Sequence, residues 1–160
     1  MTTSTTVKPQ ARMELSDHQQ GLWKAMLRFD AEVGRTGLEP ELLELVRTRA
    51  SQINHCAYCI DMHTKDALAR GETEQRLFAL NAWRETPFFT ERERAALALV
   101  EEITLVSERQ VPDDVFEEAA RHFDPGELAG LIYAATVINA WNRLAISTRM
   151  VAGEYEPGGD

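Results

Sequence analysis

The sequence predicts an all-α fold, a single-domain bundle of about seven helices. Apolar residues recur three and four positions apart through most of the chain, the spacing that places side chains on one face of a helix. Two stretches carry complete helix-start patterns, Thr90 with Glu93 and Asp124 with Pro125 and Glu127. No stretch alternates apolar and polar residues over the length of a strand between turn residues. We therefore expect helices throughout the domain.

The first half of the domain is expected to contain three helices, preceded by a flexible tail over residues 1–14. The spans expected for these helices are 16–34, 40–53 and 54–71. Ser16 with Gln19 has the pattern of a capping box, and Pro40 suits a first helical turn. Asn54 is a favourable N-cap for the third helix, and Gly71 is a favourable residue just beyond its end.

The second half is expected to contain the remaining helices and a short flexible tail. Helices are expected from Thr73 towards Pro87, from Thr90 onwards, from Pro112, and from Asp124 towards Met150. Residues 153–160 contain three glycines and one proline and should be flexible. The folded domain is thus expected to span residues 15–152.

Composition narrows the classes of function. The chain has 160 residues, of which 44% are hydrophobic, as in a globular protein with a core of its own. Its net charge of −9 argues against nucleic acid or an anionic membrane as a partner. No segment has eighteen consecutive apolar residues, and the first fourteen residues lack the apolar core of a secretory signal. We expect a cytoplasmic protein.

Both cysteines and a histidine lie at the start of the expected third helix. Cys56, Cys59 and His63 are spaced so that they share one face. Partial positive charge at a helix N-terminus favours the thiolate, and an imidazole one turn away can accept a proton. The second thiol can then close a disulfide on the oxidised first one. The pattern indicates a redox-active Cys56–Cys59 dithiol.

Other interpretations of this motif stay open at the level of sequence. The cysteines could be two small buried residues, or zinc could bind Cys56, Cys59, His63 and Glu44. Haem attachment requires a histidine directly after the second cysteine, and an iron–sulfur cluster requires more thiolates. Glu44 lies on the preceding helix and would approach the dithiol face if the two helices pack antiparallel.

The spacing of Glu44, Cys56, Cys59 and His63 resembles that of the AhpD-like alkylhydroperoxidase and carboxymuconolactone decarboxylase superfamily. Further runs that resemble this family are residues 46–54, 60–63 and 138–145, so that the likeness covers roughly residues 12–153. The resemblance implies an all-helical fold assembled as a trimer or as a hexamer. It implies a cofactor-free hydroperoxide reductase, recycled by a lipoyl or thioredoxin-like dithiol carrier.

The resemblance also implies a role for each site residue. Cys59 would attack the peroxide, Cys56 would resolve the oxidised sulfur and meet the reductant, and Glu44 with His63 would relay protons. Well-known peroxidases of the family have a histidine where this chain has Tyr58, a phenol that donates a hydrogen bond but is a poor base at neutral pH.

Two other functions remain as alternatives. One is a lyase of the carboxymuconolactone decarboxylase type, although that branch generally lacks the cysteine pair. The other is a non-catalytic, redox-responsive binding protein. The three tryptophans, Trp23, Trp83 and Trp141, are expected in the core or in subunit contacts rather than against a substrate.

Overall fold

The computed structural model describes residues 9–158, and within them every regular element is a helix. The elements are α1 (Leu15–His18), α2 (Gln20–Val33), α3 (Pro40–Ile53), α4 (Ala57–Ala69), α5 (Glu74–Ala79), the 3₁₀ helix η1 (Leu80–Glu85), α6 (Glu91–Thr104), α7 (Val106–Arg109), α8 (Asp113–His122) and α9 (Pro125–Thr148). The all-α prediction is confirmed. The short α1 and α7, of four residues each, account for most of the difference from the expected number.

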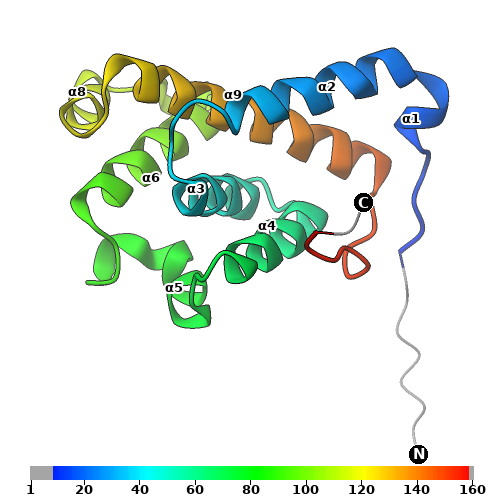
Figure 1. Cartoon of the computed structure of the whole chain (residues 1–160), viewed down its shortest axis with the longest axis horizontal. Coiled ribbons are helices and arrows are strands. Elements are labelled where there is room, and N and C mark those ends of the chain that lie inside the picture. Colours follow the sequence, from blue (N-terminus) through cyan, green and yellow to red (C-terminus); the bar gives the residue numbers. More distant parts are fainter. Residues whose placement is uncertain (1–8, 159–160) are drawn as a thin grey trace, which may run out of the picture.

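Helices α3 and α9 organise the bundle. Figure 1 shows α2 running along α9, with α3 and α4 on the other side of α9 and α5 beyond them. Helix α3 packs against α4, α6 and α9, and its side chains Leu45 and Val46 are almost fully buried. They lie in one apolar core with Leu97 of α6 and with Leu131 and Ile138 of α9. This core fixes the position of α3, and α3 in turn supports α4.

Both complete helix-start patterns are found where the sequence places them. The Thr90 side chain accepts a hydrogen bond from the Glu93 backbone N–H, and the Glu93 carboxylate accepts one from the Thr90 backbone. Asp124 and Glu127 form the same reciprocal pair at the start of α9, with Pro125 at the first helical position. These patterns act within four residues, so they need little help from the rest of the fold.

The capping box predicted at Ser16 and Gln19 is wrong. Ser16 lies inside α1, whose N-cap is Glu14, and no side chain caps α1. An N-cap residue needs an extended backbone, which a residue within a helical turn does not have. Gln19 has φ −138° and ψ 61°, so it separates α1 from α2 instead of continuing one helix.

The N-cap predicted at Asn54 is also wrong. Asn54 is the C-cap of α3, and Cys56 is the N-cap of α4. The Asn54 side-chain amide donates to Asn139 Oδ1 at 2.9 Å and to Asn142 Oδ1 at 2.8 Å. Asn54 therefore ties the end of α3 to α9, and its side chain is not free to cap the helix that follows.

The segments that flank the helices contact the domain. The backbone N–H of Arg12 donates to Thr148 O at 2.7 Å, and the backbone N–H of Gly153 donates to Asp61 Oδ2 at 3.0 Å. The sequence predicts tails over residues 1–14 and 153–160. Of these, residues 1–8 and 159–160 lie outside the described part of the chain. From residue 9 to residue 158, no helix combines the length and the apolar character that crossing a bilayer requires.

Candidate active site

The connection between α3 and α4 places Cys56. His55 has a positive φ of 57°, and this left-handed residue turns the chain at the end of α3. The His55 N–H bonds Gln52 O at 3.2 Å and the Cys56 N–H bonds Ser51 O at 3.0 Å. These two bonds are those of a Schellman motif, which satisfies the last carbonyl groups of a helix. Cys56 thus makes the last hydrogen bond of the α3 terminus and is the N-cap of α4, so the link between the two helices is only residues 54–56.

Cys56 and Cys59 form a disulfide, with Cα atoms 5.4 Å apart. Both residues are buried, and the Cys59 backbone N–H donates to Cys56 Sγ at 3.4 Å. The sulfur of Cys56 therefore lies at the positive end of α4, where a thiolate is favoured once the bond is reduced. The structure brings the predicted dithiol together at the predicted place, the start of a helix.

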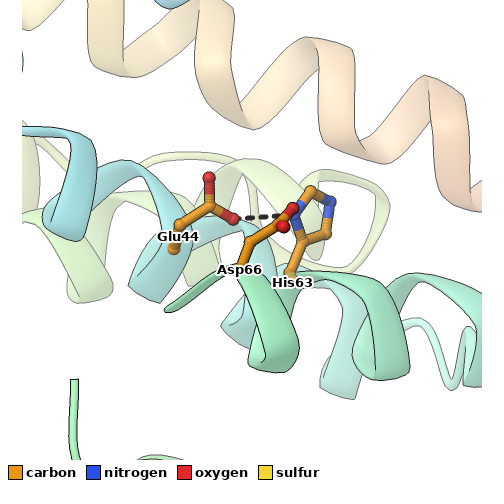
Figure 2. A group of neighbouring side chains, drawn as sticks. All are labelled: Glu44, His63 and Asp66. Carbon is orange, nitrogen blue, oxygen red and sulfur yellow. Dashed lines mark hydrogen bonds and ion pairs between the residues drawn. The ribbon is translucent and has the colours of Figure 1, made fainter. Parts of the chain in front are cut away.

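Glu44 of α3 and His63 of α4 are in direct contact. The His63 Nδ1 atom lies 2.8 Å from Glu44 Oε2, and the two residues are only 4% and 3% exposed. Figure 2 shows the carboxylate and the imidazole facing each other across the two helices. Because Glu44 fixes Nδ1, the free ring nitrogen of His63 is Nε2. His63 follows Cys59 by four residues on the same helix, so the ring lies one turn from that sulfur.

A chain of charged groups holds Glu44 ionised. Arg47 donates to Glu44 Oε1 at 3.0 Å and to Asp30 Oδ1 at 2.8 Å, and Arg70 Nε lies 3.9 Å from Glu44 Oε1. Burial raises the pKa of Glu44, but the hydrogen bond from His63 and the charges of His63 and Arg47 together lower this pKa below its ordinary value. Glu44 is thus a carboxylate at neutral pH and can stabilise a positive imidazolium.

Asp66 and Tyr155 join this group, although neither residue was predicted from the sequence. The Tyr155 hydroxyl donates to Asp66 Oδ1 at 2.7 Å, and the Lys65 ammonium donates to Tyr155 O at 2.8 Å. Burial, together with the bond to Asp66, raises the pKa of Tyr155 to about 12. The signal for Asp66 was its spacing, three residues after His63 on the same helix; nothing local marks Tyr155.

Within residues 9–158, Glu44, His63 and Asp66 also form a group that could hold a cation. One ligand atom of each lies within 4.8 Å of the others (Figure 2). However, the Glu44 oxygens already accept from Arg47 and His63, and Asp66 accepts from Tyr155. Two arginines beside Glu44 also disfavour a further positive charge. The donor set therefore fits a proton-transfer network better than a metal, and it is not the zinc set that includes the cysteines.

Two hollows adjoin the disulfide, one lined by each of its cysteines. A hollow of about 520 Å³ reaches Cys56 between the start of α4, the end of α9 and the segment after α9, with His55, Arg149 and Glu154 in its walls. A smaller hollow of about 190 Å³ reaches Cys59. Its lining residues are Trp23, Leu27, Asp30, Tyr58, Cys59, Met62, Trp141, Ala145 and Met150. The two sulfurs therefore meet different chemical surroundings.

Tyr58 lies between the two hollows and lines both. Burial and the negative charges of Asp61 and Glu14 raise the pKa of Tyr58. The phenol is thus protonated at neutral pH, where it can donate a hydrogen bond but not accept a proton as a base. His63 is buried with a carboxylate against it, whereas His55 is exposed and lines the larger of the two hollows.

Comparison with known proteins gives consistent matches. Residues 20–102 match the model of the carboxymuconolactone decarboxylase family. The uncharacterized protein YdfG of Bacillus subtilis is 40% identical over 124 residues, which are 78% of this chain and 84% of YdfG.

Two solved structures show the same fold. One is a protein of unknown function from Agrobacterium tumefaciens, whose description associates it with AhpD-type antioxidant defence. It superposes with a TM-score of 0.88 at 36% identity, over 91% of this chain and 100% of that one. The other is an AhpD-core, peroxidase-related protein from Ralstonia eutropha, with a TM-score of 0.77 at 17% identity, over 88% of this chain and 75% of that one.

Proposed function

Because the chain belongs to the carboxymuconolactone decarboxylase family, within the AhpD-like superfamily, and has a helix-start disulfide, we propose that it is a thiol-dependent hydroperoxide reductase. The observation that carries the proposal is one arrangement. The Cys56–Cys59 pair opens the same helix on which His63, one turn further, is held by Glu44. A thiol pair and an oriented proton carrier are the groups that this reaction requires.

The reaction starts from the reduced dithiol. The Cys59 thiolate attacks the outer oxygen of the hydroperoxide, so that an S–O bond forms and the O–O bond breaks. The peroxide is reduced to an alcohol, which takes up one proton, and Cys59 becomes a sulfenic acid. His63 supplies that proton, and Glu44 stabilises the positively charged imidazolium form of His63. Cys56 then attacks the Cys59 sulfur, a disulfide forms and water leaves.

The hollow at each sulfur suggests where the two reactants bind. The smaller, mostly apolar hollow at Cys59 suits an organic hydroperoxide, and the larger one at Cys56 suits the approach of a dithiol carrier. A lipoyl or thioredoxin-like carrier would reduce the disulfide by attacking Cys56. Assembly as a trimer or hexamer remains a prediction, to be checked by sedimentation of the purified protein.

The decisive experiment follows peroxide consumption with excess dithiothreitol as the reductant. We expect Cys59→Ser to lose all turnover. In a separate measurement without reductant, Cys56→Ser should consume one equivalent of peroxide and then stop with a sulfenic acid on Cys59. Turnover in Cys59→Ser equal to that of the wild type would refute the assignment. Turnover of a lactone substrate that survives alkylation of both thiols would instead favour the lyase alternative.

A matched pair of histidine variants tests the proton relay. His63→Asn should lower the rate of peroxide consumption about 100-fold, because general acid catalysis is lost. His122 also pairs with a glutamate, with Nε2 2.9 Å from Glu118 Oε1, but this pair lies on α8 away from the dithiol. His122→Asn should leave the rate unchanged. Equal rates for both variants would remove His63 from the mechanism.

A further inference from the structure

A second carboxylate lies beside the imidazole that Glu44 holds. Asp66 follows His63 by three residues on α4, so the two side chains are neighbours on the helix surface. One carboxylate oxygen of Asp66 lies within 4.8 Å of a ring nitrogen of His63 and of an oxygen of Glu44 (Figure 2). Within residues 9–158, however, the hydrogen bond of the ring goes to Glu44, at 2.8 Å, and none joins it to Asp66. Another group must therefore decide which of the two acids the imidazole binds.

The Asp66 carboxylate has a donor of its own, the phenol of Tyr155. The Tyr155 hydroxyl donates to Asp66 Oδ1 at 2.7 Å. In the part of the chain that the structure describes, no other side chain donates to this carboxylate or forms an ion pair with it. Glu44, in contrast, accepts from the guanidinium of Arg47. The two acids beside the imidazole are thus held by different partners, one by a cation and the other by a neutral hydroxyl.

Tyr155 keeps its proton at neutral pH and therefore stays a donor. Burial, the hydrogen bond to Asp66 and the negative charges of Asp66 and Glu44 raise the pKa of Tyr155 to about 12. The contribution of Glu44 also shows that the phenol lies close enough to feel the charges around His63. The bond to Asp66 is consequently present whenever the carboxylate is ionised.

The segment after α9 is fastened to α4 by other bonds as well. The Gly153 backbone N–H donates to Asp61 Oδ2 at 3.0 Å, and the Lys65 ammonium donates to the backbone oxygen of Tyr155 at 2.8 Å. These bonds hold the backbone of the segment without using the phenol. What the hydroxyl adds is a bond to one of the two acids beside His63.

We propose that Tyr155 is a positioning residue, whose hydroxyl keeps the Asp66 carboxylate from competing with Glu44 for His63. This inference rests on the proposed function. Without the hydroxyl, Asp66 would turn to a donor within its reach, the imidazole ring. A ring shared by two carboxylates either leaves Glu44 or has both of its nitrogens occupied. In both cases it delivers the proton that the alcohol product takes up less readily, because general acid catalysis requires a correctly placed donor.

The oxidation of the reduced protein by cumene hydroperoxide measures this step without the reductant. The loss of free thiols is followed with time after excess dithiothreitol has been removed. Tyr155→Phe keeps the ring and removes only the hydroxyl, and it should lower the rate about tenfold, part of the roughly 10²–10⁴ that general acid catalysis contributes. The matched control is Lys65→Met, which removes a bond to the same segment without freeing Asp66 and should keep the wild-type rate. An unchanged rate for Tyr155→Phe, or equal losses for both variants, would overturn the proposal.

A second background distinguishes competition by Asp66 from a loss of packing. Asp66→Ala removes the competing carboxylate, and alanine is well suited to a helix. In this background, adding Tyr155→Phe should change the rate less than about twofold. Only the ratio of rates within each background is compared, so that any effect of Asp66→Ala itself cancels. A loss of about tenfold in both backgrounds would mean that the hydroxyl does not act through Asp66, and the proposal would be wrong.

Nitrogen NMR of the histidine rings gives a readout that needs no substrate. In the oxidised protein, with histidine labelled at its ring nitrogens, Tyr155→Phe should move the signals of His63. Lys65→Met should leave them in place, and His63→Asn identifies them by their disappearance. Signals of His63 that stay in place in Tyr155→Phe would refute the proposal.

The two levels of inference fail differently. If the wild type does not consume cumene hydroperoxide, the proposed function fails, and the nitrogen signals still show whether Tyr155 positions His63. If the wild type turns over and Tyr155→Phe matches it in rate and in nitrogen signals, only the role of Tyr155 fails.

Discussion

Two glutamates of this protein are equally buried and both bind arginine, yet only one belongs to the candidate active site. Glu44 on α3 and Glu101 on α6 are each 3% exposed. Glu101 accepts hydrogen bonds from Trp83 Nε1 at 2.9 Å, from Arg49 Nε at 2.7 Å and from Arg84. Glu44 instead has an imidazole as its shortest contact.

The difference lies in what the partners can do with a proton. The indole and guanidinium groups around Glu101 keep their protons at every relevant pH, so this carboxylate can only hold α6, α3 and η1 together. An imidazole ring can both accept and donate a proton, and His63 lies on the helix of the dithiol. Both glutamates are thus buried and paired with arginine. Glu44 differs because its partner, His63, can exchange a proton and lies on the same helix as the dithiol.

The largest effect is expected from Glu101→Ala. This change leaves the Trp83 indole without an acceptor and Arg49 without its carboxylate, so the free energy of unfolding should fall by about 3 kcal/mol. Urea denaturation measures the loss. The rate of peroxide consumption per folded molecule should match the wild type. A slower folded enzyme would place Glu101 in the reaction and end the comparison.

The next effect is expected from Glu44→Gln. Because an amide cannot stabilise a positive imidazolium as a carboxylate does, peroxide consumption should fall about 100-fold. The amide oxygen still accepts a hydrogen bond, so the free energy of unfolding should drop less than for Glu101→Ala. The matched variant is Glu101→Gln, which should keep the full rate. If the two Gln variants lose activity equally, the distinction between the two carboxylates is wrong.

The smallest effect concerns stability in acid. The pKa of Glu101 is lowered because hydrogen bonds from Trp83, Arg84 and Arg49 together outweigh burial, which raises it. The pKa of Glu44 is also lowered. Below the ordinary value of 4.5 the unfolded chain binds more protons than the folded one, so the stability from each carboxylate is present above that pH and is lost as the pH falls further.

Each Gln variant should therefore show a shallower decrease in the free energy of unfolding as the pH falls below about 4.5. Denaturation at a series of pH values gives both slopes. An unchanged slope for Glu44→Gln, with a reduced slope for Glu101→Gln, would mean that His63 and Arg47 do not hold Glu44 ionised.

The helices whose first residues were predicted correctly are those whose capping residues lie next to each other in the sequence. Thr90 and Asp124 each cap a helix through residues within four positions, and no distant contact competes. Asn54 has an equally good side chain for capping, but it bonds Asn139 and Asn142, more than eighty residues away. Local preference was overridden there by a tertiary contact, which one sequence does not reveal.

The same division applies to the site. Cys56, Cys59 and His63 could be placed together because helical spacing alone puts them on one face. Predicting that Glu44 lies beside them required two further assumptions. These were the antiparallel packing of α3 on α4 and the resemblance to a family. Asp66 meets Tyr155 only because the segment after α9 folds back over α4. This contact has no signature in the order of the residues.

The link between α3 and α4 is only three residues long, residues 54–56, so its length is critical. The Cys56 N–H donates the hydrogen bond that closes the end of α3, and the same residue is the N-cap of α4. One residue inserted between Ser51 and Cys59 would turn α4 by about 100° about its axis relative to α3. The sulfurs and the imidazole would then face away from Glu44. This link should tolerate exchanges of side chains far better than a change of a single residue in its length.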